Sequence, residues 1–202
     1  MKTDVRVLTQ RGARTAEWFA AVAGLRAEVF RSFPYLYECD AEYEKQYLET
    51  YARSPGSVFV LALAGDQVVG ASTGLPMSDA DRAVQAPFVH RRMPLKEVFY
   101  FGESVLLPAF RGIGIGHRFF DEREAHARSL GGVLWTGFAS VDRATNDPQR
   151  PPSYRSNEAF WTRRGYVRQP DMKVRLPWKQ VGEPRETEQT LTMWLRPLEN
   201  SR

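Results

Sequence analysis

The segment best suited to chemistry is a glycine-rich turn in the stretch Glu103-Ser-Val-Leu-Leu-Pro-Ala-Phe-Arg-Gly-Ile-Gly-Ile-Gly-His117. Its glycines carry no Cβ, so a bulky anion can approach the backbone amides closely. The amides open a helix, where up to four N–H groups lack an internal partner and the dipole adds about half a positive charge. The turn is therefore predicted to hold a diphosphate. The residues expected to contact it are Arg111, Gly112, Ile113, Gly114, Ile115, Gly116 and His117.

Two other glycine-rich motifs are excluded by their spacing. The dinucleotide fingerprint needs a third glycine where His117 stands, and it normally follows the first strand of a fold. The P-loop needs Gly-Lys-Ser/Thr, and no lysine follows these glycines. Because glycine-rich turns before helices are common, the turn alone does not identify a function.

The elements that position the turn follow from hydrophobic periodicity. A strand from Glu97 to Leu107 ends at Pro108, and a helix from Gly114 to Leu130 is closed by two glycines. The apolar residues of that helix share one broad face, so the run Asp121–Glu124 is expected to be solvated. The turn is thus predicted to sit on a helix anchored to a core.

The rest of the chain alternates between strand and helix patterns. The predicted elements are a strand at Val5–Leu8, a helix capped by Thr15 and reaching Phe30, a helix at Asp40–Tyr51, a hairpin of Val58–Leu63 and Gln67–Thr73, a loop or short helix at Pro76–Pro94, a strand at Val133–Ala139, a short helix at Ser156–Arg164, and a strand pair at Lys173–Trp178 and Thr190–Leu195. With no repeat and no long linker, residues 1–202 are predicted to form one domain.

The composition favours a globular protein. Apolar residues make up 43% of the 202 residues, and the formal net charge is +4 from 28 basic and 24 acidic residues. This mild excess suits a polyanionic small molecule, and without a basic tail we expect no nucleic-acid partner. No apolar stretch is long enough for a membrane span, so we expect a cytoplasmic location and no membrane partner.

Two spaced motifs resemble those of the GNAT superfamily of N-acetyltransferases. The first is Arg111-x-x-Gly114-x-Gly116 between a central strand and a helix. The second, Asn157-x-x-Phe-Trp161-x-x-x-Gly-Tyr166, resembles the family's short helix beside the cofactor. The order of elements also matches over nearly the whole chain. The resemblance implies an α/β (α+β) fold, with a mixed, largely antiparallel sheet of about seven strands, splayed in the middle and flanked by about four helices.

The resemblance also implies where acetyl-CoA or coenzyme A, as cosubstrate, would lie. The pantetheine arm would enter the gap in the sheet and pair with free backbone groups of Val105 and Leu107, like an added strand. An amide near Val105 or Leu106 would stabilise the oxyanion formed from the thioester. Asn157 either contacts the pantetheine or caps its helix. Trp161, a further expected cofactor contact, stands where the family often has a tyrosine.

The reaction implied is transfer of an acetyl or short acyl group to a primary amine by direct attack. At pH 7 only about 0.04% of an alkyl amine is neutral, because its pKa is about 10.4, so a general base is expected. Glu103 is the candidate, since strand alternation places it with Phe99, Phe101 and Val105, where apolar neighbours would strengthen a carboxylate base. The alternative is a structural ion pair between Glu103 and an arginine.

The remaining groups are less constrained by the sequence. Tyr154 could replace the missing tyrosine acid or pack in its loop, and solvent could also protonate the leaving thiolate. The aromatic segment with Tyr35, Tyr37 and Glu38 is either a substrate wall or part of the core. We interpret Cys39 as a packing residue and predict no metal, because the histidines lack ligand spacing.

Three functions remain open at this level. The first is the N-acetyltransferase, acting on a small-molecule amine or a peptide amine. The second is a catalytically weak acyl-CoA-binding sensor or regulatory module, which the missing tyrosine favours. The third is a nucleotide-binding protein of unrelated fold. The sequence specifies neither the acceptor, nor the acyl length, nor the oligomeric state, a homodimer included.

Overall fold

The computed structural model describes residues 4–199, so residues 1–3 and 200–202 of the predicted domain lie outside the described residues. Seven strands form one sheet: β1 (Val5–Arg11), β2 (Val58–Ala64), β3 (Gln67–Pro76), β4 (Val98–Leu106), β5 (Trp135–Val141), β6 (Val167–Lys179) and β7 (Glu186–Pro197). Five α-helices occur among these residues: α1 (Phe19–Phe30), α2 (Ala41–Arg53), α3 (Arg82–His90), α4 (Ile115–Ser129) and α5 (Glu158–Arg163). Short 3-10 helices are η1 (Gly12–Trp18), η2 (Met77–Asp79), η3 (Leu95–Glu97) and η4 (Pro108–Phe110).

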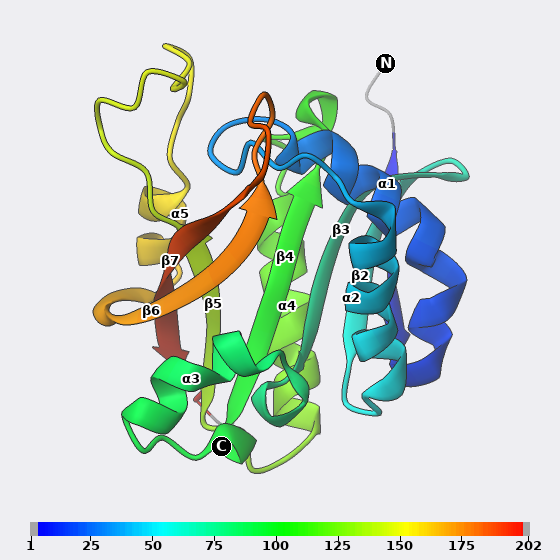
Figure 1. The fold of residues 1–202 in the computed structure, drawn as a ribbon. Helices are drawn as coiled ribbons and strands as arrows, with labels where there is room; N and C mark the ends of the chain where they lie inside the picture. The colour runs from blue at the N-terminus through cyan, green and yellow to red at the C-terminus, as the bar shows by residue number, and fades with distance from the viewer. Residues whose placement is uncertain (1–3, 200–202) are drawn as a thin grey trace.

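The sheet is splayed between its two central strands (Figure 1). Its strand order is β1-β2-β3-β4-β5-β7-β6, and every pair is antiparallel except β4 with β5. These two strands pair only where Val98–Tyr100 meets Trp135–Gly137. Beyond Tyr100, β4 stays with β3 while β5 stays with β7. The predicted mixed, largely antiparallel and splayed sheet of seven strands is confirmed.

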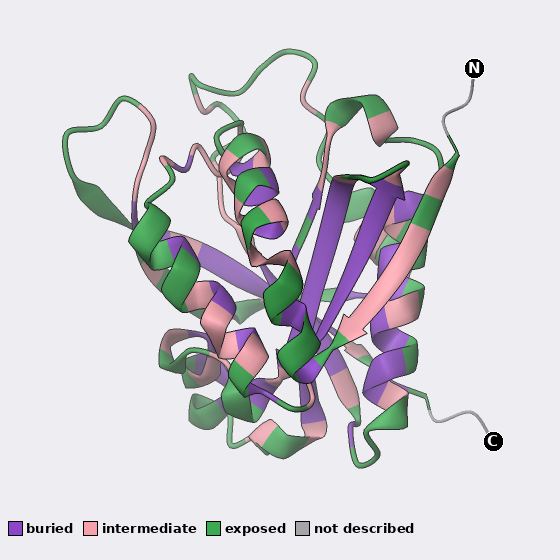
Figure 2. Cartoon of the chain, turned by 90° about the vertical axis from the view of Figure 1, so that its right-hand side faces the viewer, coloured by how far each residue is buried: buried purple, intermediate pink, exposed green. Residues whose placement is uncertain are grey.

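Helices cover both faces of the sheet (Figure 1). We call the face covered by α1, α2 and α3 the front face, and the face covered by α4 and α5 the back face. Each face has its own apolar cluster, so the inner strands are buried from both sides (Figure 2). This double burial explains why β2 is an almost continuous apolar run.

A bulge in β4 changes which residues face the front. Gly102 and Glu103 together lie opposite a single residue of β3, Thr73. Phe99 and Phe101, before the bulge, belong to the back-face cluster. Simple alternation would put Glu103 with them, but the extra residue turns Glu103 to the front face. The predicted grouping of Glu103 with these two phenylalanines is therefore wrong, because face counting assumed a regular strand.

Two local predictions need correction. Thr15 does not cap a helix; it is buried in η1, and its hydroxyl donates to the carbonyl of Gly12 at 2.8 Å. The run Asp121–Glu124 is solvated only in its first half: Arg123 and Glu124 are 1% and 4% exposed, because the sheet covers Arg123 and the residues after α5 cover Glu124. The segment 76–94 contains α3, in agreement with the predicted loop or short helix.

Candidate active site

The glycine-rich turn, residues Arg111 to Gly116, is exposed from Arg111 to Gly114, between η4 and α4, whereas Ile115 is 4% exposed and begins α4. Gly112 and Gly114 have φ values of +78° and +90°, in the left-handed region that favours glycine. A Cβ built on either residue would meet no atom within 4 Å, so the backbone borders open space. In the described part of the chain, no acceptor contacts the amides from Gly112 to Gly116.

This geometry fits the diphosphate of a coenzyme A thioester. Unpaired amides at the start of α4, a helix of 15 residues, point a positive end at the open space. Arg111 is exposed, and its Nε donates to the carbonyl of Leu106 at 3.0 Å, which holds the guanidinium between the turn and the end of β4. Ile113, at the tip of the turn, is 59% exposed. The cradle is thus preformed by backbone alone.

Helix α5 lies beside the start of α4. The rings of His117 and Phe160 meet edge to face with centroids 4.9 Å apart, and a Cβ on Gly116 would lie 3.7 Å from Phe160. Trp161 points inward, with its ring 5.0 Å from Phe138 and 5.2 Å from Trp194. Trp161 is therefore a half-buried packing residue on the back face, near the turn but anchored in the core.

Asn157 is exposed and directly precedes α5. Its side chain makes no cap hydrogen bond, whereas the hydroxyl of Ser156 accepts from the amide of Glu158 at 3.2 Å. Of the two interpretations of Asn157, the side-chain cap is contradicted. Its contact with a ligand stays a prediction.

The end of β4 offers different backbone groups from those expected. The amide of Leu107 donates to the carbonyl of Val69 at 3.0 Å, so it is engaged with β3. Because the backbone groups of an antiparallel strand alternate in direction, Val105 also faces β3 and Leu106 faces the split beside β5. The contact of Arg111 with the Leu106 carbonyl agrees with that direction. The prediction that Val105 and Leu107 offer free backbone groups is therefore wrong, and the residue directed into the split is Leu106.

Glu103 lies buried on the front face in an ion pair with an arginine. Its Oε2 accepts hydrogen bonds from Arg26 Nη1 at 2.8 Å and from the Tyr47 hydroxyl at 2.5 Å. Arg26 also binds Glu44 through Nε at 2.6 Å. Glu103 Oε1 is buried and has no hydrogen-bond partner within residues 4–199. The ion pair that the sequence left as an alternative is thus present, and one carboxylate oxygen is left unengaged.

We call Arg26, Glu44, Tyr47 and Glu103 the front-face charge cluster. One guanidinium faces two carboxylates, so the cluster has an excess of negative charge. Burial disfavours the charged form of Arg26, but the carboxylate of Glu103 and its other partners outweigh burial and raise its pKa well above the usual value. Burial and the charge of Glu103 likewise raise the pKa of the Tyr47 phenol. The tyrosine therefore stays protonated and keeps donating to Glu103.

The aromatic loop between α1 and α2 closes over this region. The rings of Phe33 and Tyr154 meet edge to face at 4.7 Å, which brings Tyr154 to the front face as a packing partner. Burial chiefly raises the pKa of Tyr35 to about 12, and Glu103 and Tyr154 lie near enough to add to the rise while Arg26 opposes it. Glu103, Tyr35 and Tyr154 thus come together in one region.

Tyr37 and Glu38 point to a different neighbour. Tyr37 is buried and forms a β-bridge with Gln180, after the end of β6. Glu38 makes an ion pair with Lys179 at 2.9 Å. These two predicted wall residues therefore fasten the loop to β6, and the charge of Glu38 is compensated.

Arg26, Glu44 and Tyr47 were not among the site residues predicted from the sequence. Their signal was present but weak: Arg26 is a charged residue on the apolar face of α1, four residues after Val22. Glu44 is likewise a buried charge on α2, four residues before the buried Leu48. A charge on an apolar face implies a buried partner, but the partner cannot be named without the fold.

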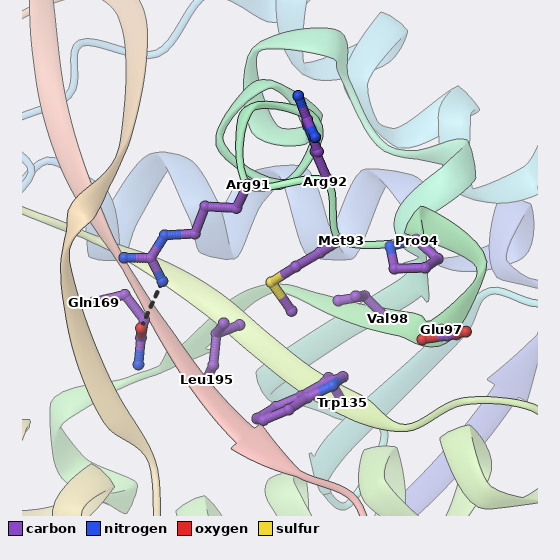
Figure 3. Close-up of a pocket in the computed structure, with 9 residues that line it drawn as sticks. All are labelled: Arg91, Arg92, Met93, Pro94, Glu97, Val98, Trp135, Gln169 and Leu195. Atoms are coloured by element: carbon purple, nitrogen blue, oxygen red, sulfur yellow. Dashed lines mark hydrogen bonds between the residues drawn. The ribbon is translucent and has the colours of Figure 1, made fainter.

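A hollow of about 380 Å³ lies at the opposite end of β4 (Figure 3). It is lined by Arg91, Arg92, Met93, Pro94, Glu97, Val98, Trp135, Gln169 and Leu195. Arg91 reaches across its rim to Gln169, with a hydrogen bond of 3.0 Å. None of the predicted site residues lines it, so this hollow belongs neither to the turn nor to the front-face charge cluster.

In residues 4–199, no group of three or more His, Cys, Asp or Glu side chains is placed to hold a metal ion. In the same range, no helix combines the length and apolarity needed to cross a bilayer.

Comparison with known proteins gives structural neighbours. No protein-family model and no curated protein matches the chain. Ribosomal-protein-alanine N-acetyltransferase from Brucella melitensis is similar at 15% identity and a TM-score of 0.60, over 95% of this chain and 99% of that chain. An acetyltransferase of the GNAT family from Streptococcus pneumoniae matches at 12% identity and 0.56, over 96% and 100%. Salmonella typhimurium yncA, solved with its cofactor acetyl-CoA, matches at 11% identity and 0.56, over 96% and 95%. The chain therefore has the fold of the GNAT acetyltransferases.

Proposed function

We propose that the chain is an N-acyltransferase that moves an acetyl or short acyl group from acetyl-CoA to a primary amine. The observation that carries the proposal is the row of unpaired amides from Gly112 to Gly116, at the start of α4 and beside the split between β4 and β5. A neighbour of the same fold was solved with acetyl-CoA, which supports the choice of donor.

The donor would be held mainly by backbone groups. Its diphosphate would lie on the turn, with Arg111 contributing a charge, and its pantetheine arm would run into the split toward Leu106. The thioester supplies an activated carbonyl. The amide of Leu106, directed into the split, is the group placed to stabilise the oxyanion.

Glu103 is the proposed general base. An attacking amine arrives mostly as an ammonium ion, and the excess negative charge of the front-face charge cluster attracts it. Oε1 of Glu103 is the oxygen that no other described residue occupies, so it can accept the amine proton directly or through a water. Arg26 and Tyr47 hold the other oxygen and fix the carboxylate in place.

The leaving thiolate needs little help, because a thiol with a pKa of about 8.5 leaves readily as its anion. Tyr154 is the proton donor nearest in kind to the tyrosine of related enzymes, and it lies on the front face through its contact with Phe33. The acceptor is proposed to be a small-molecule or peptide amine. The negative cluster favours an acceptor that carries positive charge.

Titration calorimetry with acetyl-CoA, followed by thiol release over a panel of amines, tests the proposal. We expect saturable binding and turnover with at least one amine. Binding without any turnover would favour an acyl-CoA-binding sensor instead. Absence of binding to coenzyme A and to all its thioesters would refute both.

The first mutational prediction concerns the base. Glu103→Gln should lower kcat by about 10²-fold, the usual contribution of general-base catalysis, and leave acetyl-CoA affinity within about twofold. Glu49→Gln is the matched control, since Glu49 sits on the exposed side of α2 in a pair with Arg53. Unchanged turnover in Glu103→Gln would show that another group takes the proton.

A further inference from the structure

Arg123 is a buried cation without a carboxylate partner. It is 1% exposed, and the ion pairs formed within residues 4–199 do not include it. Burial lowers its pKa to about 10, so it remains charged at neutral pH. A buried charge is costly, and an apolar side chain of similar volume is often at least as stable in such a place. The arrangement thus suggests a role other than stability.

Three hydrogen bonds of Arg123 converge on the bulge of β4, while its Nε donates to the carbonyl of Phe119 within α4 at 3.1 Å. Nη1 donates to the carbonyl of Thr73 and to the carbonyl of Glu103, both at 3.1 Å. Nη2 donates to the Ser104 hydroxyl at 2.9 Å. The guanidinium also lies 4.1 Å from the ring centroid of Phe101, the last residue before the bulge. Arg123 therefore contacts both strands at the point where their register shifts.

A bulge leaves backbone groups without ladder partners, and here a side chain from the back face supplies hydrogen bonds. The residue whose carbonyl it holds, Glu103, projects its carboxylate to the opposite face, toward Arg26. Without the bulge, alternation would return that carboxylate to the back face beside Phe101. The position of the carboxylate thus depends on a contact made on the other side of the sheet.

We propose that Arg123 is a positioning residue for acyl transfer: it clamps the bulge that presents the Glu103 carboxylate on the front face. This inference rests on the proposed function and on Glu103 acting in it. Arg123 also lies eight residues beyond Ile115 on α4, about 12 Å along the helix that carries the glycine-rich turn. One helix therefore fixes both the donor cradle and the strand that bears the base.

Arg123→Met is the main test, because methionine fills part of the volume and removes all the donors. We expect kcat to fall about 30-fold, while the KM for acetyl-CoA stays within about threefold. Arg123→Lys keeps the charge and one or two hydrogen bonds, so it should lose only about fivefold. Thr15→Ala is the control, since it removes a buried hydroxyl that donates to the carbonyl of Gly12 in η1, which takes no part in the bulge.

A double-mutant cycle with Glu103→Gln separates positioning from general damage. If Arg123 acts through the Glu103 carboxylate, Arg123→Met should cost less than about threefold once that carboxylate is gone. A merely structural role would cost the same 30-fold in both backgrounds, and that result would overturn the proposal. If Arg123→Met does not fold, Ser104→Ala takes its place, with about threefold loss in the wild-type background and none in Glu103→Gln.

A crystal structure of Arg123→Met tests the clamp without any activity. The proposal expects a regular register between β3 and β4, or a Glu103 side chain withdrawn from Arg26. An unchanged bulge with the 2.8 Å contact intact would overturn it. If the wild-type protein bound no acetyl-CoA, the proposed function would fail, while this structural comparison would still decide whether Arg123 holds the bulge.

Discussion

The glycine-rich turn and the front-face charge cluster lie near the same end of β4 but are built in opposite ways. The turn is one continuous segment, exposed, and made of backbone amides that no described residue satisfies. The cluster is buried and assembled from side chains of α1, α2 and β4, which satisfy one another. The amides of the turn are therefore open to an acceptor from outside the chain, whereas the cluster is complete apart from one carboxylate oxygen.

The difference has an energetic consequence. Hydrogen-bonding groups whose only partner is a ligand affect ligand affinity when they are lost, because they make no hydrogen bond within the free protein. Groups satisfied internally affect folding, because their loss leaves buried charges without partners. The two regions should consequently respond to mutation in different measurements.

The largest expected effect is a loss of folding stability when the front-face charge cluster is mutated. Arg26→Met leaves the carboxylates of Glu44 and Glu103 buried without a cation, and should lower the free energy of unfolding by about 3–5 kcal/mol. Urea unfolding measures this loss of stability. Arg53→Met is the control, because its pair with Glu49 is exposed and should contribute less than about 1 kcal/mol.

The comparison of the two regions would break down if Arg26→Met lowered stability no more than Arg53→Met did. The double variant Arg26→Met with Glu44→Gln tests whether unpaired buried charge is the cause of the lost stability. Removing one of the two unpaired charges should restore part of the lost stability, because a neutral amide costs less to bury than a carboxylate.

The next largest effect is a loss of acetyl-CoA affinity when the glycine-rich turn is mutated. Gly114→Val forces a branched side chain into a left-handed conformation and into the open space beside the amides, so acetyl-CoA affinity should fall by about 10²-fold. Gly182→Val is a matched control: Gly182 has φ +85° and no atom within 4 Å of a built Cβ, but it lies between β6 and β7. Both variants should lose similar stability, about 1–2 kcal/mol. Calorimetric titration gives the affinities, and equal affinity in the two variants would contradict the role of the turn.

The contrast between the regions also explains what could be predicted from the sequence. The strands and the turn follow from local patterns, since a run such as Val58–Leu63 and the glycines before α4 are contiguous signals, whereas the split in the sheet was implied only by the family resemblance. Gly114 could be placed at the start of the helix because its left-handed backbone conformation is one that a residue without a Cβ adopts readily.

Side-chain clusters assembled over long distances could not be predicted in this way. Arg26 and Glu103 are 77 residues apart, and no local pattern pairs them. The bulge at Gly102 shifted the strand by one residue, which is enough to exchange its two faces. Glu124 looked solvated because helical periodicity does not reveal that the residues after α5 cover that side of the helix. Arg123 looked solvated because of its charge, although it lies four residues after Phe119 on the side of α4 that faces the sheet.

The smallest expected effect is a pH-dependent change in stability that comes from His126. This residue lies in the last turn of α4, at the end opposite the glycine-rich turn. Its Nε2 lies 2.8 Å from the carbonyl of Gly56, so Nε2 carries the proton and donates. Nδ1 is buried and has no partner in the described part of the chain. Burial lowers the pKa of His126, and the charge of Arg11 lowers it further, while the Gly56 carbonyl opposes the shift.

The sign of the pH effect follows from that lowered pKa. Below the ordinary pKa of about 6.5 the unfolded chain takes up a proton before the folded one, so the stability contributed by neutral His126 is complete above this pH and is lost as pH falls through the folded pKa. His126→Gln retains an N–H donor for Gly56 but does not titrate. Between pH 7.5 and pH 5 the wild-type protein should therefore lose stability relative to this variant, which thermal unfolding at the two pH values measures as a larger drop in Tm. His90 and His117 are present in both proteins and cancel from the difference. Acetyl-CoA affinity at pH 7.5 should be the same in both proteins, because the amides of the turn lie at the start of α4 and His126 lies near its end. If His126→Gln lost affinity for acetyl-CoA as well as its pH dependence, the contact of His126 with Gly56 and the turn would not be independent.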